Sequence, residues 1–261
     1  MKIVVCVKHV TDATADQKFE ADNTVDRVNV DGLLSELDEY AVEQSLQLKE
    51  KNEDAEVVAL CVGPEKAADA VRKALQMGAD SGVHVSDEAI AGSDAIATAK
   101  VLAAAVNKIG GADVVVTGMA STDGAMSVVP AMLAELLDLP QVTFASVVES
   151  QGAEFRIKRD GDVATEIIGA TAPLVLSVTD QSGEARYPSF KGIMAAKKKP
   201  VENWSLSDLG VDASEVGLGA AWTAVVETTA RPARTAGEIV TDEGGSGAQA
   251  LVNFLAGKKF I

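Results

Sequence analysis

The chain has 261 residues, a formal net charge of −16 at pH 7, and 47% hydrophobic residues. This length accommodates one large domain, or one domain with an appendage, and the hydrophobic fraction is ordinary for a globular core. The acidic balance argues against nonspecific binding to DNA or RNA, which requires cations facing phosphates, but it permits steering toward basic partner surfaces.

The first half of the chain predicts an alternation of strands and helices. Short, continuous apolar runs are typical of strands buried on both faces of a sheet, and they occupy residues 3–7, 56–62, 82–85 and 113–117. A helical pattern follows each run, and the predicted helices cover residues 35–48, 64–77, 93–109 and 124–137. This alternation predicts a doubly wound α/β fold.

The first predicted helix carries an N-terminal signal. Ser35 is placed to cap the helix, and Asp38, three residues later, takes the position of the acid in a capping box. Because apolar residues recur there at helical spacing, the polar face is expected to expose Glu36, Asp38, Glu39 and Glu43 to solvent.

The second part of the chain changes character. Short turns separate strand patterns, as in antiparallel hairpins that extend the sheet; the strands are predicted at residues 141–149, 154–159, 163–169 and 174–178. Beyond Thr179 the regularity fades, and helices are predicted only near residues 205–209 and 248–255. The expected organisation is a doubly wound, mostly parallel, Rossmann-like α/β domain at 1–183 and a long C-terminal arm at 184–261.

The arm carries large apolar side chains, namely Trp204, Leu218, Trp222 and Phe254. An arm that forms no domain of its own would expose them to water. We therefore expect it to pack on a partner chain; the alternative is an arm folded back on its own domain.

A ligand site is predicted where the strand order reverses, beyond the carboxyl ends of the strands. There the loop at residues 9–15 should lie beside the loop at 118–127. Gly118 and Gly124 allow close backbone approach, and a helix starting at 124–128 would direct free N–H groups at an anion. Asp123 would cap that helix or bond a ribose hydroxyl. A plain strand-to-helix turn is the alternative.

One proline qualifies the start of that helix. Proline is tolerated in the first turn of a helix but not deeper. Pro130 therefore predicts that the regular helix begins nearer Val129.

The remaining residue types give little sign of catalysis. Cys6 and Cys61 lie in apolar runs and are expected to be buried free thiols of a soluble, cytoplasmic protein without a membrane span. His84 is expected in the sheet, and His9 near the ligand site is expected to be a hydrogen-bonding neighbour. No catalytic set, metal site or glycine-rich dinucleotide fingerprint can be assembled, so the chain is not expected to be an enzyme.

Residues 184–199 are a basic segment in an acidic chain. They carry one acidic and five basic side chains, a net charge of +4, together with apolar residues that follow no helical or strand period. The pattern predicts a loop presented to a partner; a solvated linker is the alternative.

Four stretches in order resemble the β subunit of the electron transfer flavoproteins. They are residues 2–12, 67–80, 118–124 and the segment Arg186-Tyr-Pro-Ser-Phe-Lys-Gly-Ile-Met-Ala-Ala-Lys-Lys-Lys199. Each motif alone is weak, but their order over nearly the whole chain is specific. The resemblance implies a Rossmann-like fold of the adenine nucleotide α-hydrolase type and an electron carrier that pairs with an α subunit.

The resemblance also implies cofactors and partners. It implies FAD shared with the α subunit, AMP as a structural ligand, dehydrogenases such as acyl-CoA dehydrogenases as electron donors, and a quinone oxidoreductase as acceptor. Matching nucleotide contacts are Cys6, Ser35, Glu36, Leu37, Asp38, Val62, Gly118, Met119, Asp123, Gly124, Ala125, Met126, Ser127, Val128 and Val129, and matching flavin neighbours are Ala13 and Leu37. Matching docking residues are Arg186, Tyr187, Phe190, Ile193, Met194, Lys197, Lys198 and Lys199.

The sequence departs from the family pattern at residues 126–129, where Met, Ser, Val and Val replace polar side chains common in relatives. This leaves open AMP, an empty site or a second flavin. Two other classes remain as alternatives. An ATP pyrophosphatase should carry a Ser-Gly-Gly-x-Asp-Ser loop, where this chain has Lys8-His-Val-Thr-Asp12, and a nucleotide-sensing stress protein would lack the long arm.

Overall fold

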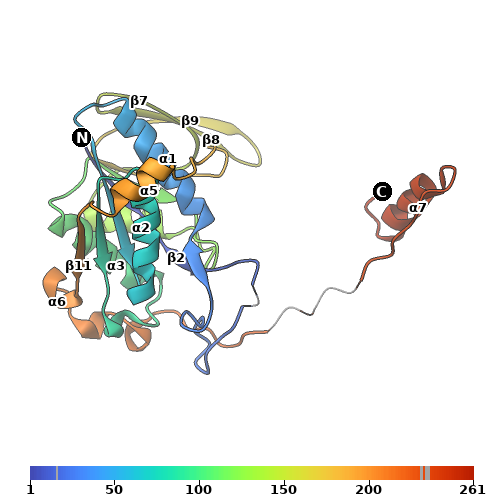
Figure 1. Cartoon of the computed structure of the whole chain (residues 1–261), viewed down its shortest axis with the longest axis horizontal. Helices are drawn as coiled ribbons and strands as arrows, with labels where there is room; N and C mark the ends of the chain where they lie inside the picture. Colours follow the sequence, from blue (N-terminus) through green and yellow to red (C-terminus); the bar gives the residue numbers. More distant parts are fainter. Residues whose placement is uncertain (16, 230–231, 233–235) are drawn as a thin grey trace. The chain divides into compact units, whose positions relative to one another are not determined.

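The computed structural model describes residues 1–15, 17–229, 232 and 236–261. These residues form two units, Met1–Glu227 and Thr228–Ile261. The larger unit is built on a nine-stranded sheet with the order β11-β5-β4-β1-β6-β10-β7-β8-β9 (Figure 1). Its strands are β1 Lys2–Cys6, β4 Glu56–Val62, β5 Ser81–Val85, β6 Val114–Gly118, β7 Gln141–Gln151, β8 Glu154–Asp160, β9 Thr165–Thr171, β10 Leu174–Val178 and β11 Val201–Trp204.

The sheet is mostly parallel. Every neighbouring pair from β11 across to β7 is parallel, whereas β7, β8 and β9 pair antiparallel. A separate antiparallel hairpin joins β2 (His9–Thr11) to β3 (Gly32–Leu34). The doubly wound sheet with antiparallel extensions is therefore confirmed, and the predicted strand at 163–169 begins two residues late, at Thr165.

Helices cover both faces of the sheet (Figure 1). One core contains residues of α1, α2 and α5, and the other contains residues of α3, α4 and α6. The continuous apolar strands supply side chains to both cores, as expected of a parallel sheet buried on two sides. The helices are α1 Glu36–Glu50, α2 Ala68–Met77, α3 Ala95–Lys108, α4 Val129–Leu137, α5 Phe190–Ala196, α6 Leu206–Leu209 and, in the second unit, α7 Ser246–Gly257.

The strand order reverses beside β1. The chain runs from β1 to β4 and β5 on one side, then crosses to β6 on the other side. Paired residues between β1 and β6 end at Val5 and Val116, so the carboxyl ends of these two strands separate. Residues 7–15 and 118–128, which follow the two strands, are called the switch-point loops below.

The polar face predicted for α1 is partly wrong. Asp38 and Glu43 are buried, at 7% and 5% exposure, whereas Glu36 is exposed. Ser35 is the N-cap residue, but its side chain makes no capping bond to the helix, so the predicted capping box is absent. Both carboxylates have partners elsewhere in the fold, and tertiary contacts outweigh the local pattern.

The predicted start of α4 at residue 124 is also wrong. The helix begins at Val129, as Pro130 indicates, with the proline in the first turn. The preceding residues 124–128 are irregular, and Ala125 and Ser127 adopt left-handed backbone angles, with φ of 49° and 58°.

The basic segment is not an irregular loop. It contains α5, and it is followed by β11, which adds a strand to the sheet edge beside β5. Residues 184–227 therefore fold on the α/β unit, and Trp204 packs on its core. The compact unit extends to Glu227, beyond the expected boundary of 183, and within this stretch β11 pairs with β5 and α6 buries Leu206.

The second unit contains α7. Three of its large apolar side chains are exposed, namely Leu251 at 58%, Val252 at 48% and Phe254 at 57%. Within the residues that the structure describes, no helix is long and apolar enough to cross a membrane.

Candidate ligand site and docking segment

The topology brings the predicted nucleotide positions to one edge of the sheet. Cys6, Val62 and Gly118 end the parallel strands β1, β4 and β6, and residues 35–38 begin α1. Ala13 lies exposed in the loop after β2. The residues following β1 and β6 lie side by side, as predicted, although the first of them form the short strand β2.

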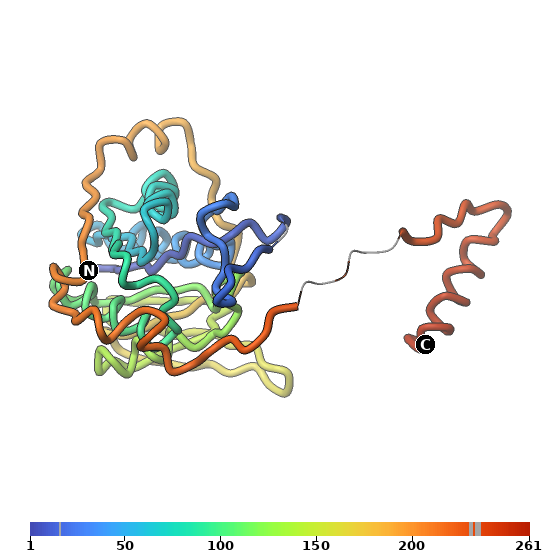
Figure 2. Tube along the Cα trace, turned by 90° about the horizontal axis from the view of Figure 1, so that it is seen from below, coloured from blue at the N-terminus to red at the C-terminus, as the bar shows by residue number. Residues whose placement is uncertain are grey.

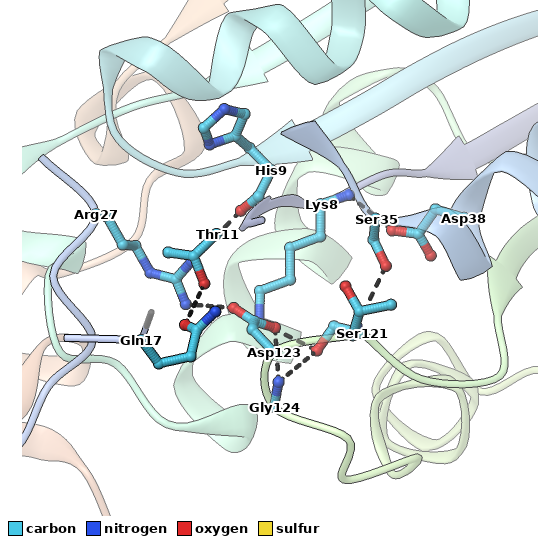
Figure 3. Close-up of polar contacts among 11 residues, drawn as sticks. Lys8, His9, Thr11, Gln17, Arg27, Ser35, Asp38, Ser121, Asp123 and Gly124 are labelled. Carbon is cyan, nitrogen blue, oxygen red and sulfur yellow. Dashed lines mark hydrogen bonds and ion pairs between the residues drawn. The ribbon is translucent and has the colours of Figure 1, made fainter. Parts of the chain in front are cut away.

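A charged cluster joins the switch-point loops (Figure 3). Lys8 Nζ donates to Asp123 Oδ1 at 2.8 Å and to Ser121 Oγ at 3.3 Å. Arg27 Nη2 donates to Asp123 Oδ2 at 2.6 Å. Asp123 therefore holds two cations, and it neither caps α4 nor has a carboxylate oxygen without a partner.

The cluster contains two cations, Lys8 and Arg27, and one carboxylate, Asp123. Burial opposes ionisation of Asp123, but the Lys8 ammonium and the Arg27 guanidinium outweigh it and hold the pKa of this carboxyl well below its ordinary value. Two cations facing one carboxylate leave a net positive charge in a chain that is strongly acidic overall. Such a charge favours a phosphate over a neutral ligand.

Asp38 lies beside the cluster (Figure 3). Burial raises the pKa of this carboxyl to about 7, and the backbone N–H of Lys8, the Lys8 charge and the backbone of Gly118 partly counter it. A Cβ on Gly118 would lie 2.6 Å from Asp38 Oδ1, so only glycine fits at the end of β6.

The irregular residues 124–128 expose backbone donors. The Gly124 N–H is paired with Ser121 Oγ and Asp123 Oδ1. Among the residues that the structure describes, none accepts a hydrogen bond from the N–H groups of Met126, Ser127 or Val128. Unpaired N–H groups next to a net positive cluster are suited to phosphate oxygens.

The histidines are structural. His9 is 8% exposed, its imidazole points away from Asp123 in Figure 3, and burial lowers its pKa. His84 is 3% exposed and contacts the Gly63 carbonyl through Nε2 at 3.2 Å. Within the described part of the chain, no three His, Cys, Asp or Glu side chains are grouped to hold a metal ion.

The cysteines are buried free thiols, as predicted. Burial raises the pKa of the Cys6 thiol, and it raises that of Cys61 to about 12. Both are therefore neutral and unreactive at physiological pH.

Sequence reasoning missed Lys8, Arg27 and Ser121 as parts of the cluster. A single lysine directly after a buried strand is a weak signal for Lys8. Arg27 lies in a long polar stretch without periodicity, and only the fold brings it to Asp123, 96 positions away.

The docking segment, residues 186–199, is fastened at both ends. Arg186 Nε donates to Glu43 Oε2 at 2.7 Å, and Nη1 donates to Glu50 Oε1 at 2.6 Å. At the other end, Lys199 Nζ donates to the carbonyl of Leu75 at 3.0 Å and also to that of Ala79. These two predicted docking residues therefore hold the segment on α1 and α2.

Between these attachments the segment presents most of its large apolar side chains to solvent and buries Ala196. It arches over α2 in Figure 2, and α5 packs on that helix. The exposed fractions are 92% for Tyr187, 81% for Phe190, 37% for Ile193 and 48% for Met194. Lys197 and Lys198 are also exposed. A cavity of about 410 Å³ lies under the segment, lined by α2, α5 and β11.

The fold is a doubly wound α/β sheet, and the charged switch-point loops lie at the reversal of strand order, where proteins of this architecture bind ligands. A family model described as "Electron transfer flavoprotein domain" matches residues 22–209. The chain is 45% identical to the electron transfer flavoprotein subunit beta of Mycobacterium bovis, over 99% of both chains. It is 36% identical to the subunit of that name from Thermoanaerobacterium thermosaccharolyticum, over 100% of both.

Another relative is named "Caffeyl-CoA reductase-Etf complex subunit CarD", from Acetobacterium woodii, and it is 32% identical over 92% of both chains. The chain belongs to the electron transfer flavoprotein family. Within that family it is a β subunit, an electron-carrier component rather than a catalytic enzyme. This membership excludes the ATP pyrophosphatase and stress-protein alternatives.

Proposed function

We propose that the chain pairs with an α subunit to form a cytoplasmic carrier. The carrier takes electrons from flavin dehydrogenases and passes them to a quinone oxidoreductase or another acceptor. The similarity to β subunits over 99% of the chain carries this proposal. The docking segment supports it, because an exposed aromatic side chain on a fastened helix suits transient binding of a partner.

FAD, shared with the α subunit, would accept and release the electrons. This chain contributes only a surface to it: Ala13 is exposed and Leu37 is half-buried, and both lie at the edge where the switch-point loops emerge. Small and aliphatic side chains can cover the isoalloxazine ring of FAD, but they cannot bind the FAD phosphates. Most flavin contacts would therefore belong to the α subunit.

The switch-point loops fit AMP by their chemistry. The unpaired N–H groups of residues 126–128 would bind phosphate, and the net positive cluster of Lys8, Arg27 and Asp123 would stabilise its charge. Apolar side chains at Met126, Val128 and Val129 do not oppose this, because the donors are backbone groups. A second FAD would use the same donors for its pyrophosphate.

The second unit is the proposed attachment to the α subunit. Its helix α7 exposes Leu251, Val252 and Phe254, and Phe260 and Ile261 after the helix are also exposed. Deleting residues 228–261 should leave the α/β unit folded but abolish co-purification with the α subunit. A truncated chain that still forms the heterodimer would refute this role.

An absorption spectrum of the purified heterodimer, followed by denaturation and identification of the released nucleotides, tests the function. One FAD and one AMP per heterodimer would support the proposal. Two FAD would assign a second flavin to the switch-point loops. A colourless chain that binds no α subunit would overturn the proposal.

A further inference from the structure

The first turn of α1 is bonded to the loop that follows β1. The Ser35 N–H donates to the Lys8 carbonyl at 2.9 Å. In return, the Lys8 N–H donates to Asp38 Oδ2 at 2.8 Å. Ser35 is fully buried and Asp38 nearly so, so solvent competes little with these bonds.

The same two residues are bonded to the loop that follows β6. The Thr122 N–H donates to Ser35 Oγ at 3.3 Å (Figure 3). Gly118 lies against the Asp38 carboxyl, where a Cβ would come within 2.6 Å of Oδ1, and its backbone lowers the pKa of this carboxyl. Ser35 and Asp38 thus bridge the gap between β1 and β6, where the sheet itself makes no bonds.

We propose that Ser35 and Asp38 are positioning residues that hold the switch-point loops at the spacing a nucleotide requires. Asp38 does so as a carboxylate, and acidification therefore weakens nucleotide binding. This role rests on the proposed nucleotide site. It differs from direct contact with the ligand, because both side chains are occupied by the protein's own backbone. An ionised carboxylate accepts the Lys8 N–H bond and needs no acceptor of its own, whereas its protonated form carries an O–H that needs an acceptor.

The surroundings place the titration of Asp38 in the physiological range. Burial raises its pKa to about 7, and Asp123 adds to this shift. Lys8 acts in the opposite direction, but it is shared with Asp123. Among the residues that the structure describes, Cys6 and Cys61 also interact electrostatically with Asp38, and both are neutral thiols.

The test measures AMP affinity of the intact heterodimer by calorimetry between pH 6 and pH 8. If only the ionised form binds, a group with a pKa near 7 reduces wild-type affinity roughly tenfold from pH 8 to pH 6. Asp38→Asn should bind AMP more weakly and should lack the pH dependence that Asp38 causes. Any pH dependence that remains in this variant reports titration of the AMP phosphate and is subtracted from that of wild type. Ser35→Ala should weaken binding but retain the pH dependence, and Glu53→Gln, at an exposed position beyond the other end of α1, should change neither.

A second readout does not depend on the ligand. Hydrogen exchange of peptides covering residues 118–128 should be faster in Asp38→Asn than in wild type at pH 8, with flavin content unchanged. A wild-type to Asp38→Asn affinity ratio that is constant from pH 6 to pH 8, or unaltered exchange, would overturn the proposal. If wild type binds no AMP, the nucleotide part of the proposed function fails, and the exchange measurement still decides the positioning role.

Discussion

Arg186 binds Glu43 through three donors. Its Nε and Nη2 reach the two oxygens of the Glu43 carboxylate at 2.7 and 2.9 Å, and its backbone N–H donates at 3.1 Å. The Glu43 side chain is only 7% exposed, whereas that of Arg186 is 35% exposed. Burial opposes ionisation of Glu43, but Arg186 outweighs it and lowers the pKa of the carboxyl. This pair fixes the start of the docking segment to the middle of α1.

Arg186→Gln should therefore loosen the docking segment. We expect electron acceptance from the cognate dehydrogenase to slow severalfold, with unchanged flavin content, and stability to fall by about 1–3 kcal/mol, because Glu43 loses its partner. Because the folded pKa of Glu43 is lowered, this stabilisation is present above its ordinary pKa and disappears as the pH falls through the folded value. Lys191→Gln, at an exposed position of the same segment, is the control.

Phe190 should anchor the dehydrogenase. It is 81% exposed on α5, and truncation of a buried aromatic anchor at an interface costs at least about 1.4 kcal/mol, or roughly tenfold in affinity. Phe190→Ala should slow flavin reduction by about that factor without loss of FAD. Val163→Ala, which removes an exposed apolar side chain elsewhere, should have no effect. Equal rates in both variants would refute the anchor role.

The three consecutive lysines should separate into two functions. Lys197 and Lys198 are exposed and available to acidic partners, so replacing both with Gln should flatten the salt dependence of electron acceptance. Lys199→Gln should instead lower stability by about 1 kcal/mol, because Lys199 bonds two carbonyls at the end of α2. A steep salt dependence in the double variant would contradict this division.

Gly118 is sterically required. A Cβ there would lie 2.6 Å from Asp38 Oδ1 and 2.7 Å from the Leu37 carbonyl. Gly118→Ala should lower stability by about 1–3 kcal/mol, because backbone must move. Gly219→Ala, where a Cβ would meet nothing within 4 Å, is the matched control for thermal unfolding of the heterodimer.

Asp38 should leave a signature in the pH dependence of stability. Its folded pKa is about 7, against 3.8 for an unperturbed aspartate. Between these values the unfolded chain releases a proton that the folded chain keeps, so wild type should lose stability relative to Asp38→Asn as pH rises from 4 to 7. The loss is up to about 4 kcal/mol, at about 1.4 kcal/mol per pH unit. Denaturant midpoints of both proteins at pH 4.5 and 7.5 measure it.

The sequence predicted the elements whose signals are local. The strand at 56–62 and the alternation with helices follow from apolar runs bounded by turn residues. Pro130 correctly placed the start of α4, since its ring restricts the preceding turn whatever the tertiary context.

Where prediction failed, long-range contacts decide the structure. Asp38 and Glu43 have the pattern of a solvated face, but their partners Gly118 and Arg186 lie far along the chain. Similarly, α5 has too few residues to show a helical period, and it is defined by its packing on α2. The strand β11 is mostly exposed and does not stand out until the neighbouring β5 supplies backbone partners. The roles proposed for the site residues remain predictions.

The strand β11 has a consequence for the docking segment. The segment connects β10, in the middle of the sheet, to β11 at its edge, so its ends are held by strand pairing as well as by Arg186 and Lys199. The conformational entropy of ordering this surface is thus lost during folding rather than at each encounter with a partner. A carrier that must bind and release partners repeatedly can then combine fast recognition with weak affinity, and substitutions that unpair β11 from β5 should slow electron acceptance without touching the contact surface.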